Sequence, residues 1–221
     1  MAESKDFFLW KKYRIWHDKC SMKVGTDSIL IGNFLISEDL PSTILDIGTG
    51  SGIISIMAAD AYPSANIVAI DIDPQSIEQA KWNFKEASID ERTSAIEYDF
   101  VSFCQLEQCS NAFDLIVSNP PYYEEDTISP NHTRGNARNT SSLSFEELIV
   151  GVKKVLAADG SFCVVVPYSA ALRFISIAAT HCLYVTHRTD VCDSKGKPFK
   201  RTLLRFSHHI RHTIHTTQTI R

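Results

Sequence analysis

The chain has 221 residues, which suits one α/β domain and leaves little room for a second. Apolar residues make up 44% of it and charged residues 22%, so it can bury a core and is not expected to be disordered. Its first residues are charged, and its most apolar window, residues 162–185, is interrupted by Pro167, Arg173 and His181. These features argue against a secretory signal and a membrane span, and we expect a cytoplasmic location.

Charge is unevenly distributed along the chain. The net charge is −4, but from residue 173 onward nine Lys or Arg stand against two Asp. A basic region on an acidic body can bind phosphate, although a solvated hairpin explains the same pattern equally well. The six cysteines form no CxxC pair, which favours reduced thiols, and we expect no obligate metal.

From Thr43 onward, strand-like and helix-like segments alternate, which is typical of a doubly wound sheet. The expected strands are Thr43–Ile47, Ile67–Ile72, Ser94–Tyr98, Leu115–Ser118 and Ser161–Val166. The expected helices are Ile53–Ala61, Pro74–Ala87, Phe145–Ala157 and Ala170–His181. Two more strand-like segments, Tyr184–Val191 and Thr202–Phe206, follow. The pattern predicts a mostly parallel, seven-stranded sheet with an antiparallel C-terminal hairpin and helices on both faces.

Local signals mark several helix ends. Pro74 suits the first position of its helix, where a missing N–H costs nothing. Ser144 and Glu147 have the spacing of a capping box, and Gly160 is expected to end the helix that begins after them.

Two segments flank the alternating region, and one long loop interrupts it. Residues 1–42 combine aromatic and basic side chains and form an N-terminal extension before the domain at 43–208. Residues 209–221 are rich in histidine, and we expect a solvated tail rather than a metal site. The loop Tyr123–Leu143 is too long for an ordinary connection and follows a strand end, which favours a substrate-binding element.

A glycine-rich turn lies directly between the first expected strand and its helix. Gly48, Gly50 and Gly52 have the spacing GxGxG, and Asp46 precedes them. Glycines let the backbone approach a ligand closely. A carboxylate at this strand end suits the positive charge of a methionine moiety and would repel a pyrophosphate. Alone, the turn is a weak signal, because a tight strand-to-helix connection has the same composition.

Acidic residues also end the next two strands. Asp71 can accept both hydroxyls of a ribose, and Asp99 can accept an adenine amine. Asp73 is expected to cap the helix that begins at Pro74. Each aspartate alone is an ordinary cap or turn residue, but together they outline a nucleoside pocket at the carboxyl ends of successive strands.

The fourth strand runs into Asn119, Pro120, Pro121 and Tyr122. The prolines fix the backbone, so that the Asn119 side chain and the Pro120 carbonyl can accept hydrogen bonds from one amine. Such bonds favour the pyramidal nitrogen that an exocyclic amine adopts when it attacks a methyl group. Tyr122 offers a face on which a planar base can stack. A rigid turn alone would explain the prolines but not the asparagine and the tyrosine.

These motifs resemble those of class I N-methyltransferases that act on planar nitrogens. The stretch HDKCSMKVGTDSILIG at residues 17–32, the loop string RGNAR at 134–138, and RTD at 188–190 before RTLL at 201–204 narrow the resemblance. They are similar to the bacterial tRNA1(Val) adenine-N6 methyltransferase family over residues 7 to about 206. The resemblance implies a Rossmann-like fold and S-adenosylmethionine as cofactor, with S-adenosylhomocysteine as product. It also implies adenine 37 in the anticodon arm of a tRNA as target, and we expect a monomer.

The resemblance also implies roles for individual residues. The cofactor contacts are Asp46, Gly48, Gly50, Gly52, Asp71, Ile72, Asp99, Phe100 and Asn119, with Lys23, Gly25, Thr26 and Asp27 as a lid over the pocket. The catalytic motif is Asn119, Pro120, Pro121 and Tyr122. The RNA contacts are Tyr122, Tyr123, Arg134 and Arg138.

Other functions fit parts of the pattern. Protein-glutamine N5-methylation and guanine-N2 methylation of ribosomal RNA present similar amines to the same motif. The short, basic and aromatic residues 1–42 favour RNA over a protein substrate. A nicotinamide oxidoreductase has no use for Asn-Pro-Pro-Tyr, and a silent RNA-binding protein has no need of a cofactor pocket.

Overall fold

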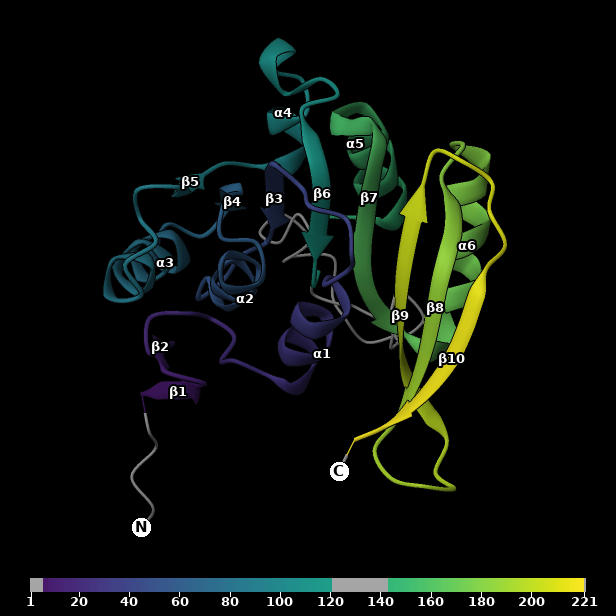
Figure 1. Ribbon diagram of the computed structural model, residues 1–221, viewed down its shortest axis with the longest axis horizontal. Coiled ribbons are helices and arrows are strands. Elements are labelled where there is room, and N and C mark those ends of the chain that lie inside the picture. The colour runs from purple at the N-terminus through teal and green to yellow at the C-terminus, as the bar shows by residue number, and fades with distance from the viewer. Residues whose placement is uncertain (1–5, 121–142, 221) are drawn as a thin grey trace, which may run out of the picture.

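The computed structural model describes residues 6–120 and 143–220, and an eight-stranded sheet lies at its centre (Figure 1). The strand order is β10-β8-β9-β7-β6-β3-β4-β5. The strands are β3 (Thr43–Ile47), β4 (Asn66–Asp71), β5 (Thr93–Glu97), β6 (Phe113–Ser118), β7 (Leu156–Pro167), β8 (Tyr184–Cys192), β9 (Phe199–Ser207) and β10 (Ile214–Thr219). A separate hairpin joins β1 (Phe7–Trp10) to β2 (Tyr13–Trp16).

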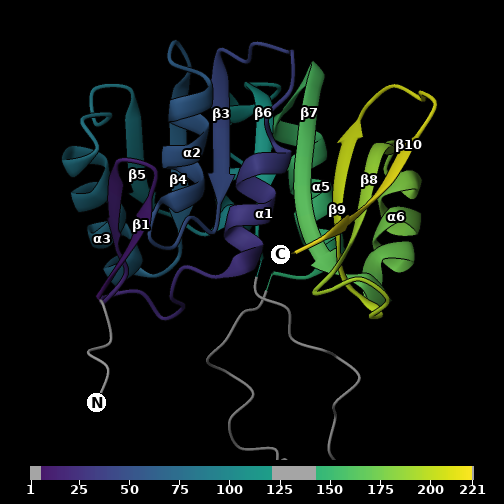
Figure 2. The same cartoon turned by 60° about the horizontal axis from the view of Figure 1, so that its bottom comes forward.

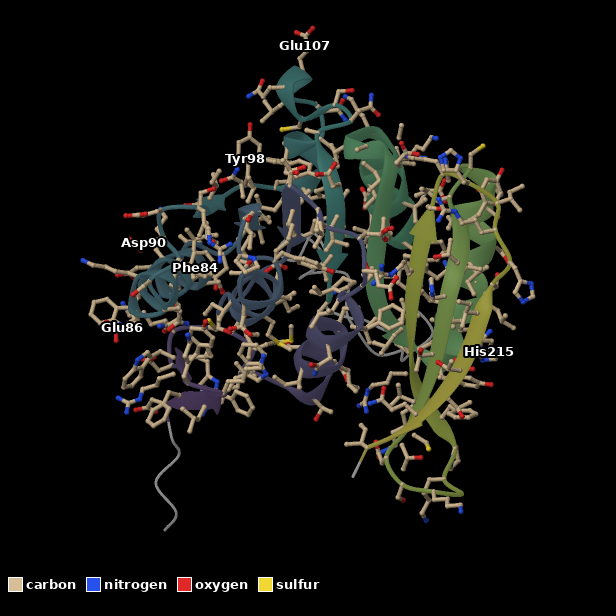
Figure 3. The ribbon with its side chains drawn as sticks, viewed as in Figure 1. Phe84, Glu86, Asp90, Tyr98, Glu107 and His215 are labelled. Atoms are coloured by element: carbon tan, nitrogen blue, oxygen red, sulfur yellow. The ribbon has the colours of Figure 1, made fainter. Side chains whose placement is uncertain are left out.

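The sheet is mostly parallel, as predicted, with β9 antiparallel to both of its neighbours, β7 and β8. The predicted count of seven strands is wrong, because β10 adds an eighth strand beside β8. All six residues of β10 are exposed, so apolar patterning could not predict this edge strand. A hydrogen bond of 2.8 Å joins His215 Nε2 on β10 to Asp190 Oδ2 on β8, and His215 is labelled in Figure 3.

Helices cover both faces of the sheet (Figure 2). One face carries α1 (Thr26–Phe34), α2 (Ile53–Ala61) and α3 (Pro74–Glu86), and the other carries α4 (Phe100–Phe103), α5 (Phe145–Val155) and α6 (Ala171–Thr180). Short 3-10 turns lie at Glu107–Cys109 and Tyr168–Ala170. The central strands are apolar on both sides because each side faces a helix layer. None of the helices within the described ranges is long and apolar enough to cross a membrane.

Most predicted helix ends are confirmed. Pro74 begins α3 after the cap Asp73, and Ser144 with Glu147 forms the expected capping box of α5. The prediction that Gly160 ends the following helix is wrong. That helix ends at Val155, and Gly160 lies inside β7, because the buried strand that pairs with β6 begins directly at Leu156.

Helix α1 is held to β9 at both of its ends. Arg201 forms an ion pair with Asp27 in the first turn, and Arg205 Nη2 donates to the carbonyls of Phe34 and Leu35 at 2.9 and 3.0 Å. Eight helical residues rise about 12 Å, and four strand residues about 13 Å, so the two arginines match the length of the helix. Helix α1 therefore has a fixed position along the sheet, with its first turn at the carboxyl ends of the parallel strands.

Candidate active site

The chain reverses its direction across the sheet at β3. From β3 it moves outward to β4 and β5, and then returns to place β6 on the other side of β3. Such a reversal opens a crevice at the carboxyl ends of the strands, where open α/β sheets bind ligands. Ile47 pairs with Ser118, so the glycine turn and Asn119 begin side by side at this crevice.

The glycine turn has the open shape that the sequence predicts. Gly48, Gly50 and Gly52 have φ angles of +72°, +54° and +80°, which side chains disfavour. Apart from its chain neighbours, a methyl group on Gly48 or Gly50 would meet no atom of the described residues within 4 Å, whereas one on Gly52 would lie 2.5 Å from the ring of Phe84. The first two glycines therefore leave space for a ligand, and the third allows α3 to pack closely.

Asp46 lies fully buried beneath this turn. Its Oδ2 accepts hydrogen bonds of 2.7 Å from Thr49 and from Ser55, while its Oδ1 has no partner within the described residues. Burial raises the pKa of the Asp46 carboxyl to about 6, against the opposing effect of the two hydroxyl donors. A buried carboxylate oxygen without a donor is costly, and a cationic group at the turn would relieve that cost.

Asp71 ends β4 and supports the turn from the side. Its Oδ2 accepts the N–H of Gly50 at 2.8 Å, and its Oδ1 accepts the N–H of Asp73 at 3.0 Å. Each carboxylate oxygen keeps further acceptor capacity. Asp73 caps α3 by accepting from the N–H groups of Gln75 and Ser76, as predicted.

The third aspartate differs from the other two. Asp99 caps the short helix α4 by accepting the N–H of Ser102 at 2.8 Å through Oδ2. The ring of Phe100 is buried and packs closely against Gly151 of α5. The side chain of Ile72 is 59% exposed and offers an apolar surface beside Asp71.

Asn119 follows β6 and contacts the first turn of α1. Its amide Nδ2 donates to Ser28 Oγ at 3.2 Å, across 91 positions of the chain, and its Oδ1 has no donor within the described residues. Pro120, the next residue, is buried. The other predicted members of the catalytic and RNA-binding sets lie outside the described residues: Pro121, Tyr122, Tyr123, Arg134 and Arg138.

The predicted lid lies at the same edge of the sheet. Lys23, Gly25 and Thr26 are exposed at the start of α1, whereas Asp27 is half-buried and paired with Arg201. Burial raises the pKa of Asp27, and Arg201 opposes that rise. Asp27 thus anchors α1.

Polar residues on the buried face of α3 hold the segment that leads to the lid. Asn83 bonds both the N–H and the carbonyl of Trp16 and also the carbonyl of Ser51, while Gln79 accepts the N–H of Lys19. These bonds lay the N-terminal segment beside the glycine turn. The sequence analysis did not predict these contacts of Gln79 and Asn83, although polar residues at helical spacing on an otherwise apolar face are a usable signal.

Ser28, Thr49 and Ser55 were also missed. Serine and threonine are common everywhere, so only the fold reveals that these three hydroxyls contact Asn119 and Asp46.

The described residues fit the expected S-adenosylmethionine. The orphaned Asp46 Oδ1 suits a cationic amine, the space above Gly48 and Gly50 admits a ligand, and Asp71 has acceptor capacity for hydroxyls.

Comparisons with known proteins agree with this geometry. The methyltransferase small domain family matches residues 23–178. A tRNA1(Val) (adenine(37)-N6)-methyltransferase of Bacteroides thetaiotaomicron is 39% identical over 202 residues, covering 91% of this chain and 83% of the relative. The protein of that name from Photorhabdus laumondii is 37% identical over 204 residues, covering 92% and 82%.

A solved structure supports the fold alone. A predicted O-methyltransferase from Agrobacterium tumefaciens has a TM-score of 0.67 at 16% identity, covering 88% of this chain and 86% of that one. The chain is therefore an S-adenosylmethionine-dependent methyltransferase that belongs to the methyltransferase small domain family and, within it, to the tRNA1(Val) (adenine(37)-N6)-methyltransferase family.

Proposed function

We propose that this chain methylates the N6 amine of adenine 37 in tRNA1(Val), the reaction for which its relatives are named. The observation that carries the proposal is the position of Asn119 beside the glycine turn at the switch point of the sheet. A base whose amine meets Asn119 then lies next to a ligand held above Gly48 and Gly50. A tRNA substrate also favours the cytoplasm as the location.

The contacts proposed for the cofactor surround the crevice. Asp46 faces the cationic amine, Asp71 accepts the ribose hydroxyls and Asp99 accepts the adenine amine. The full proposed set is Asp46, Gly48, Gly50, Gly52, Asp71, Ile72, the backbone of Phe100, Asp99 and Asn119, with Lys23, Gly25, Thr26 and Asp27 close by. When bound, the cofactor supplies a methyl group on a positively charged sulfur.

Asn119 and Pro120 act on the target amine. The lone pair of this amine is delocalised into the adenine ring, which makes it a poor nucleophile. Asn119 Oδ1 and the Pro120 carbonyl each accept one N–H, which favours the pyramidal nitrogen of the transition state. The methylated nitrogen would lose its excess proton to water, so no residue of the chain has to act as a general base. Ser28 holds the Asn119 amide so that Oδ1 remains available.

The remaining substrate contacts belong to the proposal by sequence alone. Tyr122 and Tyr123 are proposed to stack on the target base, and Arg134 and Arg138 to bind phosphates of the anticodon arm. Pro121, which lies between Pro120 and Tyr122, is proposed to stiffen the motif.

Two other acceptors present the same kind of amine. Protein-glutamine methyltransferases usually carry a helical N-terminal domain, whereas residues 6–42 here form a hairpin and one helix packed on the catalytic domain. Guanine N2 of ribosomal RNA presents a similar amine, and the chemical identity of the methylated product distinguishes it from adenine N6.

The test is the chemical identity of the methylated product. The purified protein and deuterium-labelled cofactor are incubated in three separate reactions, with total tRNA, with ribosomal RNA and with a ribosomal protein extract. Mass spectrometry of the digests should detect labelled N6-methyladenosine from tRNA. Labelled N2-methylguanosine or N5-methylglutamine without N6-methyladenosine would refute the proposal.

A further inference from the structure

The carboxyl edge of the sheet is divided by charge. On one side it has Asp46 near the end of β3, Asp71 at the end of β4 and Asp99 two residues after β5. At the other end of the same edge, the turn between β8 and β9 (residues 193–198) projects from the sheet and carries Lys195 and Lys197 (Figure 1). The exposed lysines of this turn therefore favour the approach of a polyanion at this end of the edge.

Among the described residues, the ion pairs near the turn involve Asp193 and do not include Lys195 or Lys197. The carboxylate of Asp193 is engaged by Lys200 and, at 3.4 Å, by Arg201 Nη1. Within the described residues, no carboxylate lies within ion-pair distance of Lys195 or Lys197, and both side chains are exposed. Their charges are thus available to an external anion.

A hollow lies between this turn and the end of β10. It has a volume of about 500 Å³, and its lining includes Lys195, Lys197, Thr217, Gln218 and Thr219. Ammonium, hydroxyl and amide groups are the donors that proteins use for phosphate oxygens. The hollow therefore offers donors of the right chemistry on two sides.

An aromatic ring follows β7, the strand that lies between β6 and β9. Tyr168, which follows β7, is 40% exposed, and its ring centroid lies 5.3 Å from that of Phe199 in the lining of the hollow. The guanidinium of Arg188, which is mostly buried and paired with Asp190, lies 5.8 Å from the Tyr168 ring and supports its position. An exposed aromatic ring can serve as a stacking surface for a base of single-stranded nucleic acid.

We propose that the turn between β8 and β9, with the hollow behind it, binds backbone phosphates of RNA next to the target nucleotide, and that Tyr168 stacks on a neighbouring base. The inference rests on the proposed function and names a binding surface for its substrate. Three strand spacings, about 14 Å in total, separate β6 from β8, so a single-stranded loop spans the distance from Asn119 to the turn.

The first test removes the two lysine charges. The variant Lys195→Gln/Lys197→Gln is compared with the control Lys81→Gln/Lys85→Gln, which removes two exposed charges from α3 at the far end of the sheet. Binding of a tRNA1(Val) transcript is measured across a salt series, with cofactor affinity and melting temperature as checks. The turn variant should lower the slope of log affinity against log salt by about 1.4, and the control should not change it.

An unchanged slope in the turn variant overturns the surface while leaving the proposed function intact, provided that wild-type protein methylates the transcript. If wild-type protein neither binds nor methylates the transcript, the proposed function fails and the surface fails with it.

The second test addresses stacking. Tyr168→Ala should raise KM for the transcript at least fivefold with little change in kcat, and Tyr168→Phe should behave like wild-type protein because it keeps the ring. Equal KM values for all three proteins would show that Tyr168 does not contact RNA.

Discussion

The two halves of the sheet hold their functional groups in different ways. Around β3 and β4, short local bonds fix the site: Asp71 accepts the N–H of Gly50, and Asp46 accepts the hydroxyl of Thr49 only three residues away. Around β9, long-range contacts fix the position of α1, because Arg201 and Arg205 bind residues of α1 or its C-cap that lie about 170 positions earlier in the chain. The glycine turn is thus fixed by residues within about 25 positions of one another, whereas the position of α1 depends on residues from the other end of the chain.

Asn119 lies between the two halves and depends on both. Asn119 follows β6, which pairs with β3 beside the glycine turn. Its amide donates a hydrogen bond to Ser28 of α1, the helix that β9 anchors. Changes at Asn119 should therefore affect catalysis most, changes in the cofactor half should affect cofactor affinity, and changes at Ser28 should affect turnover mildly.

The largest effect is expected from Asn119→Ala. If Asn119 Oδ1 stabilises the transition state more than the ground state, kcat should fall by about 100- to 1,000-fold, with little change in KM for tRNA. Steady-state kinetics measures both. Asn33→Ala is the control, because among the described residues that exposed amide bonds only the carbonyl of Ile29 on its own helix. A rise in KM with unchanged kcat would make Asn119 a binding residue.

The next largest effect concerns the cofactor half. Asp71→Ala should weaken cofactor binding by about 1.5–3 kcal/mol, the range for a hydrogen bond to a charged group. Calorimetry measures the affinity, and Asp90→Ala, at an exposed aspartate between α3 and β5, is the control. Unchanged affinity in a folded Asp71→Ala protein would remove Asp71 from the cofactor site.

Asp46 should make cofactor binding depend on pH. Burial raises its pKa to about 6, so most of the carboxyl is protonated at pH 5. A cationic ligand prefers the carboxylate, so affinity should fall by about tenfold from pH 7 to pH 5. The Asp46→Asn protein should lose this dependence in calorimetry at the same two pH values. An equal dependence in both proteins would assign the titration to another group.

The same raised pKa has a consequence for stability. Between about pH 4 and pH 6 the folded protein binds more protons at Asp46 than the unfolded chain does. The contribution of Asp46 to the free energy of unfolding therefore decreases as pH rises through this window. This sign is opposite to that of a carboxylate whose pKa is lowered by pairing.

The smallest effect is expected from Ser28. Ser28→Ala removes one neutral hydrogen bond of 3.2 Å to Asn119, so kcat should fall by about fivefold, the equivalent of roughly 1 kcal/mol. Ser28→Thr keeps the hydroxyl and should restore kcat. Cofactor affinity and KM should remain unchanged in both. Failure of threonine to restore turnover would show that packing, not the hydroxyl, matters at this position.

The cofactor half was predictable because its signals are local. The glycine turn, the capping aspartate Asp73 and the strands that flank them follow from contiguous patterns, and the structure has them in the predicted order. Their positions at one edge follow from the parallel sheet.

The other half was predictable only in outline. The hairpin of β8 and β9 was expected from apolar alternation, but β10 is exposed along its whole length and carries no such signal. The pairs that anchor α1 join Asp27 to Arg201 and the end of α1 to Arg205, and sequence separation of this size leaves no local pattern. Ser28 has the same limitation, because a serine in a first helical turn is ordinary until the fold places Asn119 beside it.

Asn119 and the crevice beside it are proposed to methylate one adenine amine in RNA. The most direct measurement compares two tRNA1(Val) transcripts, one with adenine 37 and one with guanine 37, in single-turnover methyl transfer followed by nucleoside mass spectrometry. We expect N6-methyladenosine from the first transcript only, and from wild-type protein but not from Asn119→Ala at matched times. Equal methylation of both transcripts, or full activity of the Asn119→Ala protein, would contradict this proposal.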